Sequence, residues 1–163
     1  MNRALFIDRD GVINRKGGPY YIHRIEDFAF NQGIIETLKA FSLAGYKIIV
    51  ITNQGGIAKM SHTEEDTIRL HDYMISRLAE GGATITAVYY CPHHPSVSEC
   101  LCRKPGTLLF EKAIQEHNID RKSSLMIDDS EIDIEAAAKS GIRGIRVKTN
   151  CDLTTIEGLC AGA

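Results

Sequence analysis

The sequence predicts an α/β fold of the Rossmann-like, three-layer kind, in which helices cover both faces of a parallel sheet. Apolar runs alternate along the chain with segments of helical spacing, and this alternation is typical of parallel sheets. The apolar runs are continuous, as strands are when both faces of their sheet are buried. The 163 residues are 44% apolar and 25% charged, so one globular domain over residues 1–163 is expected. No separate cap domain is expected in a chain of this length.

Three strands and two helices are predicted in the first half of the chain. The strands are short apolar or β-branched runs, at residues 4–7, 47–51 and 85–90. The first helix, residues 34–44, follows from apolar residues that recur at nearly helical spacing, with Gly45 as its expected C-cap. The second helix begins after Thr63, an N-cap residue followed by three acids that favour a helix N-terminus. It is expected to end near residue 78, before the glycine pair at 81 and 82.

The second half of the chain repeats the alternation. Helical spacing predicts helices at residues 107–117 and 132–139, and Gly141 stops the second of them. Apolar runs predict strands at 125–127 and 144–147, and one or two helical turns are expected at 154–160.

Charge and hydropathy exclude two classes of partner. Nineteen Lys and Arg residues against 21 Asp and Glu give a net charge of −2 without a basic face, so nucleic acid is not an expected ligand. The longest apolar stretches, such as Ile48 to Ile51, are far shorter than the roughly 20 residues of a membrane span. The start of the chain shows no signal-peptide pattern, so a cytoplasmic protein is expected, and we expect it to be a monomer.

Polar residues follow the predicted strands, at the edge of the sheet where ligands bind in such folds. Asp8 and Asp10 follow the first strand two residues apart, so both carboxylates can face one cavity, and Gly11 allows the chain to turn. A second acidic group, Asp128-Asp129 with Asp133, follows the fourth strand. These carboxylates would repel one another without a cation, and oxygen ligands suit Mg²⁺. Asp-x-Asp-Gly alone could be an ordinary turn, but the second cluster favours a site.

The loop at residues 91–102 has the composition of a zinc site. Cys91, His93, Cys100 and Cys102 follow the spacing C-x-H-x6-C-x-C, and Cys₃His is a known structural, tetrahedral zinc set. His94 is a competing ligand, and the alternative is that these cysteines are simply buried. Five cysteines cannot all pair within the chain, and the remaining two are expected to be free thiols, at Cys151 and Cys160. Four other histidines lack ligand-like neighbours and are expected on the surface or in loops: His23, His62, His71 and His117.

Four motifs in the expected order resemble those of the haloacid dehalogenase (HAD) phosphatases. Phe6 to Asn14, which reads FIDRDGVIN, is similar to the first motif, and the others correspond to Thr52-Asn53, Lys104 and Asp128-Asp129 with Asp133. The likeness extends to about Val147. The zinc loop followed by Cys-Arg-Lys-Pro resembles the subfamily of histidinol-phosphate and heptose bisphosphate phosphatases. Several stretches resemble the heptose branch in particular, namely 8–14, 22–28, 52–58 and 89–95.

The resemblance implies catalytic roles for these residues. Asp8 would be the nucleophile that forms an aspartyl-phosphate, and Asp10 would protonate the leaving alcohol and then activate water. Mg²⁺ would lie on Asp8, the Asp10 carbonyl and Asp129. The Thr52 hydroxyl and the Asn53 backbone would hold phosphoryl oxygens. Lys104 would contact the nucleophile and the phosphate, and Arg103 would contact the sugar-phosphate substrate. The pocket would be lined by Lys16 to Pro19 and by residues 52–55, which include Gln54 and Gly55.

The chain also departs from the family pattern. Asp128 stands where Gly is usual, Ser130 where a basic residue is often found, and Gly55 where Ser is usual in Asn-Gln-Ser-Gly. Because Ser130 carries no positive charge, the chain lacks one cation that would favour binding of a doubly phosphorylated substrate.

The expected function is therefore Mg²⁺-dependent hydrolysis of a small sugar phosphate, D-glycero-D-manno-heptose 1,7-bisphosphate, to heptose 1-phosphate, with a structural Zn²⁺. An alternative within the same class is histidinol-phosphate phosphatase. Alternatives of another class are a phospho-accepting signalling receiver, which carries its acceptor after the third strand, and a zinc-loop interaction module without catalysis.

Overall fold

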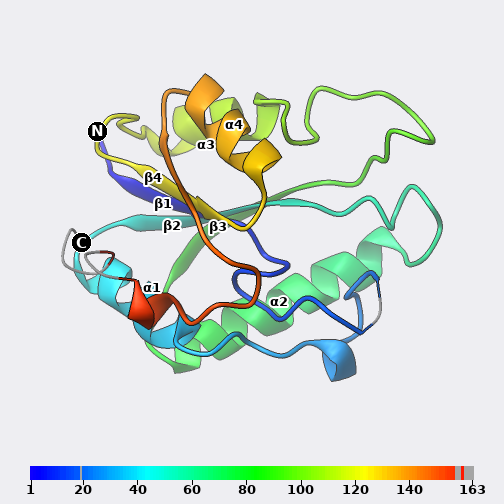
Figure 1. Cartoon of the computed structure of the whole chain (residues 1–163), viewed down its shortest axis with the longest axis horizontal. Coiled ribbons are helices and arrows are strands. Elements are labelled where there is room, and N and C mark those ends of the chain that lie inside the picture. The colour runs from blue at the N-terminus through cyan, green and yellow to red at the C-terminus, as the bar shows by residue number, and fades with distance from the viewer. Residues whose placement is uncertain (19, 157–158, 160–163) are drawn as a thin grey trace.

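Five parallel strands form one sheet in the computed structural model, which describes residues 1–18, 20–156 and 159. The strand order is β3-β2-β1-β4-β5 (Figure 1). The bounds are β1 Ala4–Ile7, β2 Lys47–Asn53, β3 Ile85–Cys91, β4 Leu125–Asp128 and β5 Arg143–Arg146. The predicted parallel sheet is confirmed, although β2 continues through Thr52 and Asn53, which were expected to follow the strand.

Helices cover both faces of this sheet, as predicted. Figure 1 shows α1 (Ile34–Leu43) and α2 (Glu64–Glu80) below the sheet, and α3 (Leu108–His117) and α4 (Glu131–Lys139) above it. Two short 3-10 helices complete the described elements, η1 (Ile25–Asp27) and η2 (Leu153–Thr155). The helical turns expected at 154–160 fall partly outside the described residues, as do the predictions for Pro19 and Cys160.

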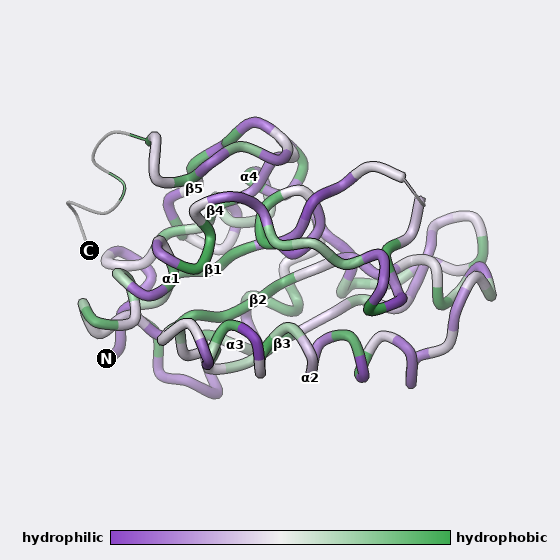
Figure 2. The backbone as a smooth tube through the Cα atoms, turned by 90° about the horizontal axis from the view of Figure 1, so that it is seen from below, coloured by the Kyte–Doolittle hydropathy of each residue, from purple (hydrophilic) through white to green (hydrophobic). Residues whose placement is uncertain are grey.

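Alternating side chains of the strands build two cores, one on each face of the sheet. Leu5 and Ile7 of β1 pack below with Leu38 and Met74 of the helices. The intervening Phe6 packs above, where its ring lies 5.4 Å from that of Phe110. Figure 2 shows the hydrophobic strands in the middle of the molecule. Burial of both faces explains why the strand sequences are continuously apolar.

The second helix begins as its sequence predicts. The Asp66 amide donates to Thr63 Oγ1 (3.1 Å), and the Thr63 amide donates to Asp66 Oδ2 (2.9 Å), which together form a capping box. The expectation of a surface or loop position is wrong for His71, however, because it lies within α2 and is only 4% exposed. His62 lies in the loop before α2, although it is only 7% exposed. His71 lies on the buried side of α2, facing the residues that follow β1.

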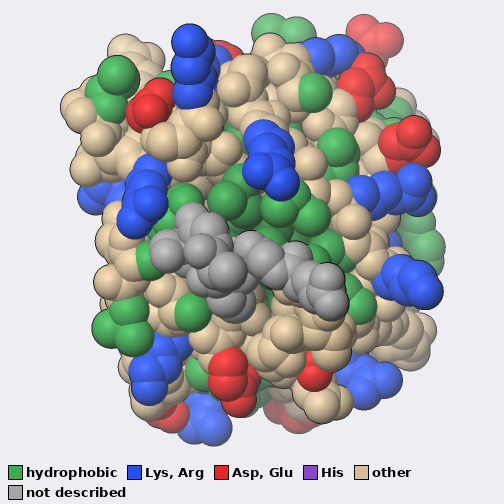
Figure 3. All heavy atoms as spheres, turned by 60° about the vertical axis from the view of Figure 1, so that its left-hand side comes forward, with side chains coloured by type: hydrophobic (Ala, Val, Ile, Leu, Met, Phe, Trp, Pro, Cys, Tyr) green, Lys and Arg blue, Asp and Glu red, His purple; other side chains and the backbone are tan. Residues whose placement is uncertain are grey.

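The two ends of the sheet differ in character. At the carboxyl ends of the strands lie the polar residues that the sequence singles out. The face toward the chain termini, seen in Figure 3, shows hydrophobic side chains gathered in its middle, with charged ones around them. Among the described residues, none of the helices combines the length and the apolar character needed to cross a bilayer.

Candidate active site

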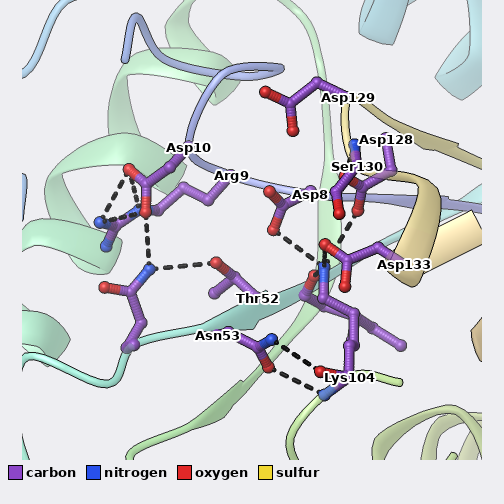
Figure 4. A network of polar contacts seen from close by, with 12 residues as sticks. Asp8, Arg9, Asp10, Thr52, Asn53, Lys104, Asp128, Asp129, Ser130 and Asp133 are labelled. Carbon is purple, nitrogen blue, oxygen red and sulfur yellow. Dashed lines mark hydrogen bonds and ion pairs between the residues drawn. The ribbon is translucent and has the colours of Figure 1, made fainter. Parts of the chain in front are cut away.

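Polar residues at or just after the carboxyl ends of β1, β2 and β4 line one cavity of about 890 Å³. Most of the predicted site residues line it: Asp8, Asp10, Lys16, Thr52, Asn53, Gly55, Arg103, Lys104 and Asp129. In Figure 4 the carboxylates of Asp8, Asp128 and Asp133 lie around the Lys104 ammonium, whereas that of Asp10 is directed toward Arg9. The parallel strands bring these residues together because all their carboxyl ends lie at one edge.

Lys104 is the central cation of this site. Its Nζ lies 3.1 Å from Asp8 Oδ1, 3.0 Å from Asp128 Oδ2 and 3.2 Å from Asp133 Oδ2. It also donates to the Ile51 carbonyl at 2.9 Å. Burial disfavours the ammonium, but the carboxylates outweigh this effect and raise the pKa of Lys104 above its ordinary value. Lys104 is therefore charged, and it neutralises part of the acidic cluster.

The carboxyl groups of this cluster still outnumber its one cation, Lys104. Burial raises the pKa of Asp8 to about 6, with Lys104 opposing and Asp133 and Asp10 adding to the rise. Burial and the nearby Asp8 likewise raise the pKa of Asp128 to about 9, against the effect of Lys104. Such shifts mark a site that disfavours further negative charge unless a cation binds.

The residues present fit a magnesium ion on the side of Asp8 away from Lys104. The oxygens of Asp8, Asp128 and Asp133 lie within 4.8 Å of one another, but Lys104 already contacts all three. In Figure 4 the Asp129 carboxylate lies on the opposite side of Asp8 from Lys104. The Asp129 side chain is 5% exposed and accepts a hydrogen bond from Thr149 Oγ1 at 2.7 Å. It also forms an ion pair with Lys16, whose Nζ lies 3.9 Å away. Carboxylate oxygens so placed are the ligands that Mg²⁺ prefers.

Gly11 permits this close approach of Asp129. Its φ of 91° is a left-handed conformation that side chains rarely adopt. A Cβ atom there would lie 2.4 Å from Asp129 Oδ2. The Asp-x-Asp-Gly sequence thus serves both the turn and the packing of the second acidic group against the first.

Asp10 is held by donors on several sides. Its Oδ1 accepts from Arg9 Nη2 (3.0 Å) and Asn14 Nδ2 (3.0 Å), and its Oδ2 accepts from Gln54 Nε2 (2.9 Å). Burial alone would raise the pKa of Asp10, but the Arg9 guanidinium and the amide donors lower it below its ordinary value. Asp10 therefore rests as a carboxylate of fixed orientation.

The three polar residues after Ile51 have different positions. Thr52 and Asn53 line the cavity, whereas the Gln54 side chain is buried behind it and bonds Asp10 and Thr52 Oγ1 (3.0 Å). The Asn53 side chain clamps the main chain of Lys104: Oδ1 accepts from its amide (3.0 Å), and Nδ2 donates to its carbonyl (3.2 Å). Asn53 thus ties β2 to the segment that carries Lys104.

The four predicted zinc ligands lie together. Their ligand atoms are within 4.8 Å of one another, with Cys91 Sγ 3.6 Å from Cys100 Sγ and 3.1 Å from Cys102 Sγ. His93 Nδ1 lies 3.2 Å from Cys102 Sγ. His94 instead turns away, and its Nδ1 contacts Ser96 Oγ at 2.7 Å. Three sulfurs and one nitrogen in this arrangement fit tetrahedral Zn²⁺, with His93 as the fourth ligand.

The cysteine–histidine loop also supports the cavity wall. Arg103 directly follows it, and its Nη1 donates to the His93 carbonyl at 3.1 Å. A Cβ atom at Gly55 would lie 3.1 Å from Arg103 Nη1 and 3.2 Å from the His93 carbonyl oxygen. A serine at position 55 would therefore require the Arg103 side chain or the loop to shift by a few tenths of an ångström. Ser130, the other small departure, donates its amide to Asp128 Oδ1 at 2.9 Å.

Sequence reasoning missed several groups that complete the site. Arg9, Asn14 and Thr149 contact Asp10 or Asp129, and His71 contacts Arg9. Arg9 and Asn14 lie within the first motif, so their position in it was an available signal. Nothing local to the sequence marks Thr149 or His71, since only the fold brings them to the site.

Known proteins resemble this chain over most of its length. The family model described as HAD-hydrolase-like matches residues 101–155. The D-glycero-alpha-D-manno-heptose-1,7-bisphosphate 7-phosphatase of Photorhabdus laumondii is 40% identical over 154 residues, 90% of this chain and 83% of the relative. The D-glycero-beta-D-manno-heptose-1,7-bisphosphate 7-phosphatase of Haemophilus influenzae is 38% identical over 155 residues, 92% of this chain and 80% of that protein.

Solved structures agree with the sequence relatives. The crystal structure of D,D-heptose 1,7-bisphosphate phosphatase from B. bronchiseptica, complexed with magnesium and phosphate, superposes with a TM-score of 0.85 at 26% identity. The superposition covers 94% of this chain and 84% of that one. A HAD-like phosphatase structure from Mesorhizobium loti shares the fold, with a TM-score of 0.88 at 23% identity, covering 99% and 85% of the two chains. Taken with the four motifs at the sheet edge, these likenesses show that the chain belongs to the heptose-1,7-bisphosphate 7-phosphatase family of HAD-like hydrolases.

Proposed function

We propose that this protein hydrolyses D-glycero-D-manno-heptose 1,7-bisphosphate to heptose 1-phosphate and inorganic phosphate. The observation that carries the proposal is the site itself: Asp8, bonded to the buried Lys104, faces a cavity beside Asp10 and Thr52. The names of the sequence relatives support the substrate, and they include both anomers.

The first step forms an aspartyl-phosphate. An Asp8 carboxylate oxygen attacks the phosphorus of the phosphate group on C7 of the sugar. A new O–P bond forms to Asp8, and the bond between phosphorus and the C7 oxygen breaks. Asp10 takes up a proton from solvent as the substrate binds and gives it to the departing sugar oxygen. Asp10 rests as a carboxylate, and the approach of a phosphate dianion raises its affinity for the proton that it then delivers.

Water then hydrolyses the intermediate. Asp10, ionised again, removes a proton from a water molecule whose oxygen attacks the phosphorus, and the O–P bond to Asp8 breaks. The fixed orientation of Asp10, held by Arg9, Asn14 and Gln54, suits it to both transfers.

Charge in these steps is balanced by fixed groups. Lys104 neutralises the nucleophile and the incoming phosphate, while the Thr52 hydroxyl and the backbone N–H of Asn53 hold phosphoryl oxygens. Mg²⁺, which Asp8, the Asp10 carbonyl and Asp129 would hold, supplies charge neutralisation between carboxylate and phosphate.

The mouth of the cavity suits a second phosphate. Lys16 and Arg103 line the cavity and carry the positive charge that a phosphate group requires. We propose that these groups replace the cation missing at Ser130. A doubly phosphorylated substrate thus remains compatible with this chain.

The test is phosphate release with Mg²⁺ from both anomers of the heptose bisphosphate and from histidinol phosphate. We expect release of one phosphate per heptose bisphosphate, much slower release from histidinol phosphate, and none of either by Asp8→Asn. Preference for histidinol phosphate would overturn the substrate. A stable phosphoprotein without turnover would instead indicate a receiver, and inactivity on every substrate would favour a binding module.

A further inference from the structure

The buried His71 of α2 contacts the residue that holds Asp10. Its Nε2 lies 3.1 Å from Arg9 Nη1. Arginine keeps its proton in proteins, so Nη1 donates and Nε2 accepts. The His71 ring is consequently neutral, with its proton on Nδ1. Burial and then the Arg9 charge lower the pKa of His71 to about 3, consistent with this state.

Arg9 is itself fully buried, and its bonds reach three parts of the chain. Nε and Nη2 donate to the adjacent Asp10, and Nη2 also donates to the Ile22 carbonyl at 2.7 Å. The contact with His71 attaches the guanidinium to a helix on the lower face of the sheet. Both terminal nitrogens of the Arg9 guanidinium are therefore held by hydrogen bonds, Nη1 by His71 and Nη2 by Asp10 and the Ile22 carbonyl.

A fixed guanidinium in turn fixes Asp10. Asp10 accepts hydrogen bonds from the side-chain amides of Asn14 and Gln54, but its charged partner is Arg9. If Nη1 lost its acceptor, the guanidinium would rotate toward another one, because a buried donor without a partner is costly. Asp10 would then move with it or lose one of its bonds.

We infer that His71 is a positioning residue for Asp10, acting through Arg9. This role rests on the proposed function, in which Asp10 transfers protons during both half-reactions. His71 lies outside the cavity lining and touches no reacting group, so its effect is expected on kcat and not on substrate affinity.

Four variants test this role. His71→Phe keeps a ring but removes the acceptor, and His71→Asn keeps polarity but places its oxygen short of Arg9. His71→Gln places an oxygen near the position of Nε2. The matched control is Thr67→Val, one turn earlier on α2, where the buried hydroxyl bonds only the Thr63 carbonyl among the described residues (3.4 Å).

We expect kcat for the heptose bisphosphate to fall about tenfold to hundredfold in His71→Phe and His71→Asn, with KM within about twofold of wild type. His71→Gln should recover most of the loss, and Thr67→Val should leave kcat unchanged. In an Asp10→Asn background, measured by single turnover, His71→Phe should change the residual rate by less than about twofold, because Asp10 is the group through which His71 acts.

The outcomes separate this inference from the proposed function. If the wild type releases no phosphate, the proposed function fails and this role fails with it. If the wild type is active, the inference is overturned by any of three results: unchanged kcat in folded His71→Phe and His71→Asn, no rescue by glutamine, or an undiminished His71→Phe effect without the Asp10 carboxylate.

Discussion

Replacing Lys104 with methionine should destabilise the fold itself. Lys104 Nζ lies 3.0 to 3.2 Å from three carboxylates, and the side chain is 1% exposed. Methionine fills a similar volume but carries no charge. Removing one partner of such a buried ionic group costs roughly 3–5 kcal/mol, since uncompensated charge remains. In a chain of this length each kcal/mol corresponds to about 2–4 °C, so we expect Tm to fall by about 6–20 °C.

The loss should depend on pH. Asp8 and Asp128 have folded-state pKa values of about 6 and about 9, above the ordinary value of 3.8. Groups with raised pKa values stabilise the fold at low pH, and this contribution is lost as pH rises through the folded-state value. Without Lys104 both pKa values rise further, so the deficit of Lys104→Met relative to wild type should be larger at about pH 8.5 than at about pH 5.5.

Thermal unfolding in buffer free of Mg²⁺ and chelator measures this effect. The control is Lys139→Met on α4, which breaks an exposed pair with Glu135 at 2.6 Å. Such surface pairs contribute about 0–1 kcal/mol, so the control should shift Tm by no more than about 4 °C at either pH. Equal deficits at both pH values, or a Lys104→Met shift no larger than the control, would refute the assignment of Lys104 as the cation of the cluster.

Three further predictions concern the zinc loop, a buried histidine and the phosphate contact. Elemental analysis should find about one zinc per chain in the wild type and in His94→Ala, and none in His93→Ala; the reverse result for the two variants would make His94 the ligand. The contribution of His71 to the free energy of unfolding should fall by up to about 1.4 kcal/mol per pH unit below about pH 6.5, because the unfolded state takes up the His71 proton first. The difference in slope between the wild type and His71→Gln in urea titrations measures this contribution. A slope unchanged by His71→Gln would assign it to other groups. Thr52→Val should lower kcat for phosphate release about 10²-fold, and a rate within about twofold of wild type would exclude a role for its hydroxyl.

The fold was predictable from the sequence because its signals are local. Continuous apolar runs define the strands, and the capping box at Thr63 with the glycines after Glu80 bounds α2. The parallel arrangement follows from alternation alone, and it places every strand's carboxyl end at one edge. Asp8 and Asp129, which are 121 positions apart, can therefore be assigned to one site from the sequence alone.

The supporting contacts depend on packing that no local pattern encodes. Whether a side chain in a turn points into the site depends on backbone angles there, as Arg9 and Gln54 illustrate. His71 lies 62 positions from Arg9, and a helix buries both histidine and leucine on the same side. His93 and His94 are chemically equivalent in sequence, and only the loop's path turns one toward the sulfurs and the other toward Ser96.

The proposed mechanism requires that Asp8 becomes phosphorylated during turnover. Rapid quenching with the heptose bisphosphate and Mg²⁺, followed by borohydride reduction, converts an aspartyl-phosphate to homoserine, which peptide mass spectrometry locates. We expect homoserine at position 8 within the first turnover, its decay as phosphate is released, and none without substrate or in Asp8→Asn. Phosphate release at full rate without homoserine at position 8, or with it at another aspartate, would contradict the mechanism.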